Sequence, residues 1–98
     1  MIRHIVFWNL LPEAGGKTLE ENAAEMKKRL EALPNEISGI LRMEVGRNYN
    51  PKGFDVCLYS EFASRDALEK YQVHPAHKEV QSFVHSVIRE RAVTDCEA

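Results

Sequence analysis

Features that define several specialised protein classes are scarce or missing in this chain. Only two cysteines, Cys57 and Cys96, occur among 98 residues, and they lie far apart without a metal-binding spacing. No apolar run approaches the length of a membrane-spanning helix. The N-terminus also lacks the long apolar core and the cleavage site of a signal peptide. We therefore expect a cytoplasmic protein with two free thiols, of which Cys57 is buried in a strand.

Charge of one sign is not in excess either. The formal net charge is −2, and acidic and basic residues are interleaved along the chain. Because no stripe of Lys and Arg surrounds the aromatic residues, nucleic acid is not an expected partner. The Gly15-Gly16 pair is not followed by a glycine-rich phosphate-binding pattern. The hydrophobic fraction of 44% is ordinary for a globular chain, and the length fits one domain over residues 1–98.

The spacing of apolar residues predicts strands and helices that alternate along the chain. A capping box at Thr18 and Glu21 starts the first helix, which Pro34 ends. Ser64 caps a second helix, and Pro75 starts a short third one. The predicted strands are 2–10, a segment within 37–48, 54–62 and about 84–93, followed by a frayed tail at 95–98. This order predicts a ferredoxin-like α+β sandwich (βαββαβ), with a four-stranded antiparallel sheet and helices on one face.

The first predicted strand has apolar side chains on both faces. Its alternation places Ile2, His4, Val6 and Trp8 on one face and Arg3, Ile5, Phe7 and Asn9 on the other. The helices can cover only one face of the sheet. Burying a large apolar side chain stabilises by roughly 1.5–3 kcal/mol, so we expect the second face to pack against another copy. The prediction is a homodimer with a dimeric α+β barrel; a monomer with one solvated face is the alternative.

The stretch from Tyr71 to His77 concentrates groups that can carry chemistry. It contains two of the four histidines, a tyrosine and a proline. Pro75 fits the first turn of a helix and pushes His74 out of helical geometry. His77 then lies near the positive end of that helix, which favours a neutral imidazole that can transfer a proton.

These residues resemble the stress-responsive dimeric α/β barrel (Dabb) family. The resemblance rests on His4 in the first strand, the Ser64 helix with its Tyr71–His77 end, and the following Phe83-Val84, and it covers nearly the whole chain. It implies the dimeric barrel. In a plant polyketide cyclase of that family the catalytic groups are a strand histidine, and a histidine and tyrosine of this motif. By position these imply His4, His77 and Tyr71 here.

The candidate catalytic residues are therefore His4, Tyr71 and His77. A neutral imidazole can remove a proton next to a carbonyl, and a phenol or second imidazole can stabilise the enolate. Each also has a structural interpretation: His4 as a core histidine, His77 as a helix cap and Tyr71 as a packing residue. The candidate ligand-binding residues are Val6, Phe7, Trp8, Tyr59, Phe62 and His74, where His74 has the structural alternative of shaping the turn. His74 and His77 are spaced for a zinc site, but no third ligand is indicated, so no metal or cofactor is expected.

Three functions remain open at this level. The first is a small barrel that binds a partly apolar molecule and performs cofactor-free acid–base chemistry. The second is a noncatalytic dimer that serves stability or stress tolerance. The third is a cofactor-free monooxygenase of a related dimeric family, against which the His-Pro-Ala-His segment argues. A cavity beside His4, Tyr71 and His77 would favour the first over the second.

Overall fold

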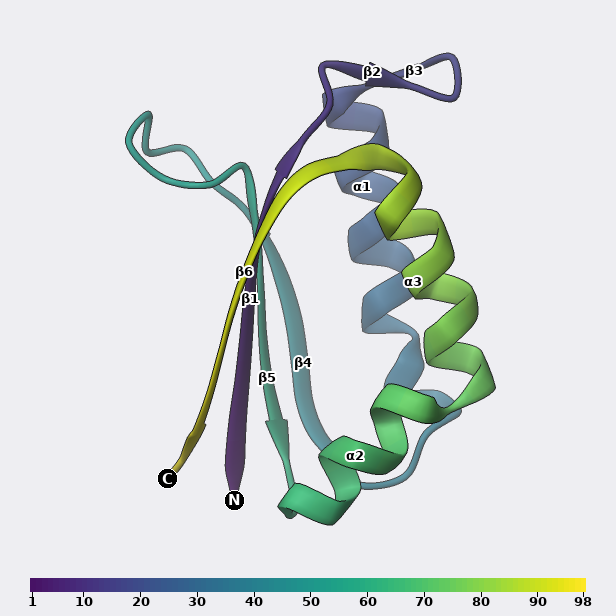
Figure 1. The fold of residues 1–98 in the computed structure, drawn as a ribbon, viewed down its shortest axis with the longest axis vertical. Coiled ribbons are helices and arrows are strands. Elements are labelled where there is room, and N and C mark those ends of the chain that lie inside the picture. The colour runs from purple at the N-terminus through teal and green to yellow at the C-terminus, as the bar shows by residue number, and fades with distance from the viewer.

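A computed structural model describes all 98 residues as an antiparallel sheet with the helices on one face (Figure 1). Its strands lie in the order β4-β5-β1-β6. They are β1 (Ile2–Leu10), β4 (Ile40–Arg47), β5 (Val56–Phe62) and β6 (Ile88–Glu97). The helices are α1 (Leu19–Glu31), α2 (Arg65–Val73) and α3 (Pro75–Val87), with a 3-10 turn at Leu33–Asn35. A small hairpin of β2 (Glu13–Ala14) and β3 (Lys17–Thr18) precedes α1. The predicted ferredoxin-like α+β fold is confirmed.

Local side-chain caps begin each helix where the sequence places them. The Thr18 hydroxyl accepts from the backbone N–H of Glu21, and the Glu21 carboxylate accepts from the N–H of Thr18. The Ser64 hydroxyl accepts from the N–H of Ala67 at the start of α2. These bonds fix where α1 and α2 begin.

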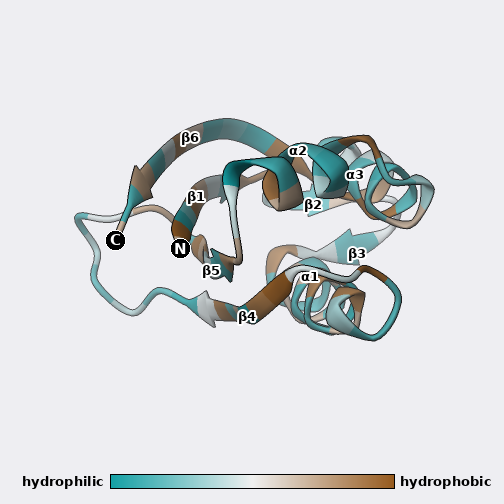
Figure 2. Ribbon diagram, turned by 90° about the horizontal axis from the view of Figure 1, so that it is seen from below, coloured by the Kyte–Doolittle hydropathy of each residue, from teal (hydrophilic) through white to brown (hydrophobic).

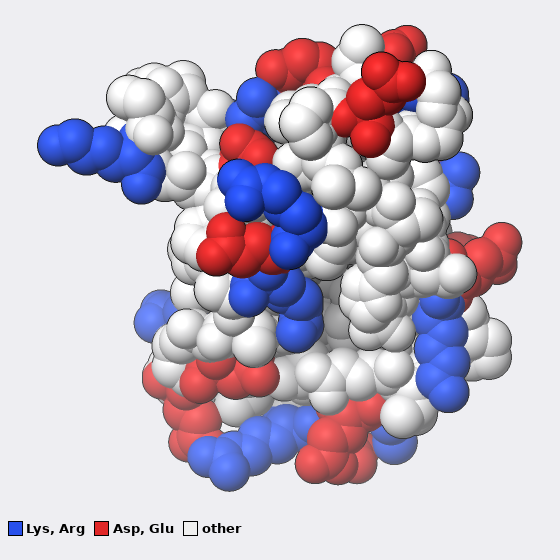
Figure 3. Space-filling model, turned by 45° about the horizontal axis from the view of Figure 1, so that its top comes forward, with Lys and Arg blue, Asp and Glu red and all other residues white.

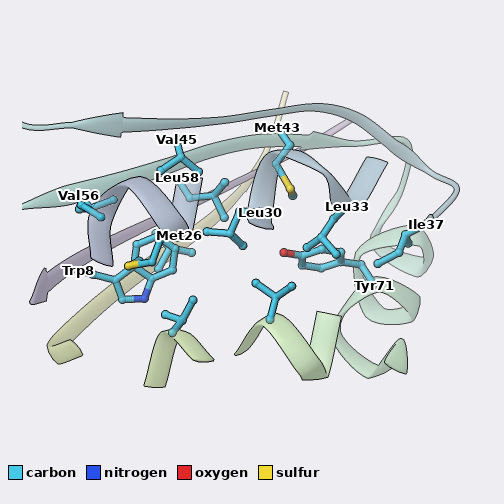
Figure 4. Packing of buried hydrophobic residues seen from close by; sticks show 14 of the residues in the cluster. Trp8, Met26, Leu30, Leu33, Ile37, Met43, Val45, Val56, Leu58 and Tyr71 are labelled. Carbon is cyan, nitrogen blue, oxygen red and sulfur yellow. The ribbon is translucent and has the colours of Figure 1, made fainter. Parts of the chain in front are cut away.

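The hydrophobic core lies between the sheet and the helices. Figure 2 looks along the strands and shows α1 and α3 side by side on one side of the curved sheet. Figure 4 shows side chains from both layers meeting between them. The helices contribute Met26, Leu30, Tyr71, Val80 and Val84, and the strands contribute Val6, Trp8, Met43, Val45, Leu58 and Phe62.

The opposite face of the sheet has no helix over it (Figure 1). Phe7 is 37% exposed there, and the ring of Phe54 packs against it with centroids 5.9 Å apart. The loop between β4 and β5 projects on this side, and it carries Tyr49, which is 99% exposed. A single subunit therefore leaves aromatic groups in water on this face.

Two positions depart from simple strand alternation, and the predicted burial of Cys57 is wrong. A β-bulge between Ile40 and Arg42 turns Leu41 outward, so Leu41 is 59% exposed and does not share a face with Met43 and Val45. Phe54 precedes β5 and lies with Phe7, on the other face from Val56. Cys57 is only half-buried, because it occupies the uncovered face.

The last helix and strand also differ from the prediction. Helix α3 continues to Val87, so β6 begins at Ile88 instead of near Val84. The tail is ordered as part of β6, because Ile2 pairs with Glu97 and His4 pairs with Asp95. Glu97 also forms an ion pair with Arg65 at the start of α2. The longer strand brings Asp95 to the inner face of the sheet.

The surface carries charges of both signs. Figure 3 shows acidic and basic side chains next to each other in small groups, with uncharged surface between the groups. On α1, Lys27 pairs with Glu31 and Arg29 with Glu25, each one helical turn apart. None of the helices combines the length and apolar character needed to cross a membrane.

Replacing Gly39 by alanine should destabilise the fold through α2. Gly39 has φ +91°, and an added Cβ would lie 2.8 Å from the Cβ of Ala67. Strain and clash together should lower the free energy of unfolding by roughly 2–3 kcal/mol. Gly15→Ala is the control, because Gly15 has φ +62° and no atom within 4 Å of the added Cβ. It should cost about 1 kcal/mol. If urea unfolding showed equal losses of free energy for Gly39→Ala and Gly15→Ala, the close contact between Gly39 and Ala67 of α2 would be contradicted.

Candidate functional site

A cavity of about 30 Å³ lies between the sheet and α3. It has room for about one or two water-sized groups. A larger surface groove of about 350 Å³ runs beside α2 and β6, but no histidine lines it. We therefore place the candidate site at the smaller cavity, where the chemistry-bearing side chains meet. Its lining residues are His4, Val6, Trp8, Leu30, Leu58, His77, Gln81, Val84, His85 and Arg91.

His4 is held in place by an acidic partner on the neighbouring strand. It lies on the inner face of β1, is 4% exposed, and its Nδ1 contacts the carboxylate of Asp95 on β6. An ionised carboxylate only accepts hydrogen bonds, so Nδ1–H of His4 is the donor. The bond fixes the orientation of the ring and leaves Nε2 as its second functional nitrogen.

His77 is arranged as a neutral base. Its Nδ1 lies 3.3 Å from the carbonyl oxygen of Gln72. Because a carbonyl only accepts, Nδ1 carries the proton and Nε2 of the neutral ring keeps its lone pair. Burial lowers the pKa of His77 below its ordinary value; the Gln72 bond opposes this shift, and repulsion from His4 and then Arg91 adds to it. The neutral form is therefore favoured.

Tyr71 lies behind His77 and not in the cavity wall. It is 1% exposed, and its ring centroid is 4.2 Å from that of His77. Figure 4 shows its hydroxyl directed into the core, on the side of Leu30. Burial raises the pKa of Tyr71, so the phenol stays protonated near neutral pH, and its hydroxyl can donate or accept a hydrogen bond.

The predicted ligand-binding residues fall into three groups. Val6 and Trp8 line the cavity. Phe62 is fully buried in the core, 4.9 Å from Tyr71 between ring centroids, and does not reach the cavity. Phe7 and Tyr59 lie on the opposite face of the sheet, so the structure does not bring them to the cavity of their own subunit. This follows from strand alternation, since both are one residue out of phase with the inner face.

His74 has a structural partner of its own. Its Nδ1 accepts a hydrogen bond of 3.0 Å from the backbone N–H of Ala76 and caps α3. It does not line the cavity beside His77. No three His, Cys, Asp or Glu side chains are grouped to hold a metal ion.

Several residues of the site could not be found from sequence alone. Asp95 and Arg91 reach the inner face only because β6 pairs with β1 in one particular register. Gln81 and His85 join through helical spacing from His77, a pattern that was visible in the sequence. The useful signal for β6 would have been its period-two pattern extended through the tail.

The indole N–H of Trp8 is buried without a hydrogen-bond partner. Trp8 is 5% exposed and lines the cavity. Leaving such a donor unpaired costs about 1–3 kcal/mol, and most buried donors in proteins are paired. A residue of the cavity wall therefore carries a buried donor that no protein group satisfies.

The shifted pKa of His77 predicts a pH dependence of stability. As the pH falls below about 6.5, the ordinary pKa of histidine, the unfolded chain takes up the proton before the folded chain does. Stability contributed by the neutral ring is therefore present above that pH and lost below it. His77→Gln should make the fall in urea stability between pH 7.5 and 5.5 shallower than in the wild type. If the stability of the two proteins fell equally with pH, the lowered pKa of His77 would be contradicted.

The chain is similar to a known protein family and to solved structures. The chain matches the model of the stress responsive A/B barrel domain over residues 2–98. None of the curated proteins compared with the chain matches it. A solved structure from Bacteroides fragilis, described as a dimeric protein of unknown function with a ferredoxin-like fold, is 34% identical with a TM-score of 0.84. The match covers 99% of this chain and 95% of that one.

Two solved enzymes share the fold at low identity. A hydroxynitrile lyase from Passiflora edulis is 17% identical with a TM-score of 0.79, over 97% of this chain and 90% of that one. An antibiotic biosynthesis monooxygenase is 13% identical with a TM-score of 0.80, and the match covers 100% of this chain and 98% of that one. At these identities the likeness concerns the fold alone. The family match over almost the whole length is decisive: the chain belongs to the stress responsive A/B barrel (Dabb) family.

Proposed function

We propose that the protein binds a small, partly apolar carbonyl compound in the cavity and transfers a proton at the carbon next to the carbonyl, without a cofactor. One observation carries the proposal. Two imidazoles meet in one cavity, and each has its Nδ1 bonded to an acceptor, so that each has its Nε2 available. The remaining wall is formed mainly by apolar side chains, which strengthen electrostatic interactions by excluding water.

His77 takes the role of the base in this proposal. Its neutral Nε2 removes the proton and becomes an imidazolium, while the electron pair of the C–H bond moves onto the carbonyl oxygen as an enolate. His4, oriented by Asp95, donates to that oxygen when protonated at Nε2. Tyr71 supports the ring of His77 from behind and acts as a positioning residue in this geometry. Return of the proton to either end of the enolate completes an exchange or an isomerisation.

A noncatalytic role is the second candidate, and the size of the cavity favours it. A space of about 30 Å³ is too small for a whole substrate unless wall side chains move. The exposed His85 and the half-buried Gln81 on α3 are the groups most free to do so. A solved hydroxynitrile lyase with this fold supports the capacity of the architecture for catalysis without identifying a substrate for this chain. The monooxygenase alternative rests on fold alone.

The protein also forms a homodimer through the uncovered face of its sheet in this proposal. Ile5 and Phe7 on β1 and Ala92 on β6 share that face. The β4–β5 loop projects on the same side and carries the exposed Tyr49. Hydrogen bonds among Asn48, Asn50 and Lys52 connect residues within this loop. The Bacteroides fragilis protein, described as dimeric, supports the assignment.

The chemical proposal predicts a histidine-dependent exchange reaction. In D2O the protein should accelerate deuterium uptake at the carbons next to the carbonyl of 2-hexanone, followed by NMR. His77→Gln should lower the protein-dependent rate by roughly 10²-fold or more, because it removes the base. Lys78→Gln, an exposed neighbour on the same helix, is the matched control and should keep the rate. Exchange equal to that of buffer in the wild-type protein would favour the noncatalytic candidate.

The assembly proposal predicts dissociation when a charge enters the uncovered face. The wild-type protein should have twice the 11.2 kDa mass of the chain by light scattering. Phe7→Glu should shift it to the mass of a single chain, because an unpaired carboxylate would be buried in the interface. Ser82→Glu places the same charge on the exposed surface of α3 and should leave the mass unchanged. A wild-type monomer would contradict the proposed interface.

A further inference from the structure

Two polar groups in the cavity wall can only donate hydrogen bonds, the indole of Trp8 and the guanidinium of Arg91. The other polar side chains of the wall are His4, His77, Gln81 and His85, and no acidic side chain is among them. Asp95 contacts His4 but does not line the cavity. A neutral ketone would use only part of this set, since it offers a single acceptor oxygen. The unpaired indole N–H and the guanidinium together indicate that the natural ligand has a second, anionic acceptor.

Trp8 supplies the first donor for that group. Its indole Nε1 is buried, has no partner in the protein, and can only donate. Figure 4 shows the nitrogen on the side of the ring that faces α3, the helix whose side chains form the opposite wall of the cavity. A ligand oxygen on this side would satisfy the donor.

Arg91 supplies the positive charge. It pairs directly with Trp8 across β1 and β6, so both side chains leave the sheet on the same face. Five of the seven arginines, at 29, 42, 47, 65 and 89, each have a glutamate oxygen within 4.0 Å. Arg3 and Arg91 form no ion pair, and of these two only Arg91 lines the cavity. A guanidinium beside an indole N–H is suited to a carboxylate, which has two oxygens in one plane.

We infer that the substrate is an oxo acid, whose carboxylate is bound by Trp8 Nε1–H and Arg91 and whose carbonyl lies beside His77. The inference rests on the proposed function and names its substrate class. The small size of the cavity is consistent with entry of a carboxylate head. The apolar remainder then packs along Val6, Leu58 and Val84 once His85 and Gln81 move aside.

The test compares 2-oxohexanoate with 2-hexanone, which has the same carbonyl without the carboxylate. Trp8 is the only tryptophan of the chain, so its fluorescence reports binding at the site directly. The wild-type protein should bind 2-oxohexanoate at least about tenfold more tightly than 2-hexanone, because hydrogen bonds to a charged group are the stronger ones. Equal affinities would overturn the inference.

Substitutions of Arg91 and Trp8 then test whether these two residues bind the carboxylate of the ligand. Arg91→Gln should remove most of the preference for the acid, and Arg91→Lys should restore part of it through its charge. Arg89→Gln removes the same charge from the same strand but outside the cavity, and should keep the preference. Trp8→Phe, followed by calorimetry, should weaken acid binding about tenfold and leave 2-hexanone nearly unaffected. A preference that survives both Arg91→Gln and Trp8→Phe would overturn the assignment.

Failure of the inference and failure of the proposed function give different results. If 2-hexanone exchanges deuterium with dependence on His77 but the acid has no advantage in binding, the inference fails and the function stands. If the acid binds through Arg91 without any exchange, the chemistry fails while the anion site stands. If neither compound changes the fluorescence of Trp8 or gives a calorimetric signal, both are contradicted.

Discussion

The break between α2 and α3 at His74 and Pro75 is the constraint on which the candidate site depends. Proline ends one helix, and the ring of His74 caps the next by accepting from Ala76. This turn places the last carbonyls of α2 against the first turn of α3, where the Gln72 carbonyl faces Nδ1 of His77. The same turn packs the ring of Tyr71 against that of His77. Tautomer, burial and orientation of His77 therefore follow from one local feature.

Strand β1 contributes side chains both to the cavity that His77 lines and to the uncovered face of the sheet. On the inner face, β1 presents His4 and Trp8 to the cavity. On the outer face it presents Phe7, which no element of the same subunit covers fully. One strand thus serves both the chemistry and the proposed assembly. A substitution that shifted its register by one residue would exchange the two sets of side chains and abolish both.

Much of this arrangement follows from sequence patterns, because they act locally. The alternation in residues 2–10 places His4, Val6 and Trp8 together, and the proline positions the start of α3. The bulge at Leu41 and the length of β6 do not follow, since they depend on pairing with distant strands. For that reason Asp95, predicted in a frayed tail, and Arg91 escaped detection. Phe7 and Tyr59 illustrate the reverse case: their aromatic character suggested a pocket, but alternation places them on the other face.

The central claim is that His77 is a neutral imidazole whose proton is on Nδ1, which leaves the lone pair on Nε2. Nitrogen-15 NMR of the imidazole rings, titrated from pH 8 to 4, measures both properties on the same residue. The account predicts the Nδ1–H tautomer at neutral pH and a pKa for His77 below the ordinary value of about 6.5. An Nε2–H tautomer, or a pKa above that value, would contradict it.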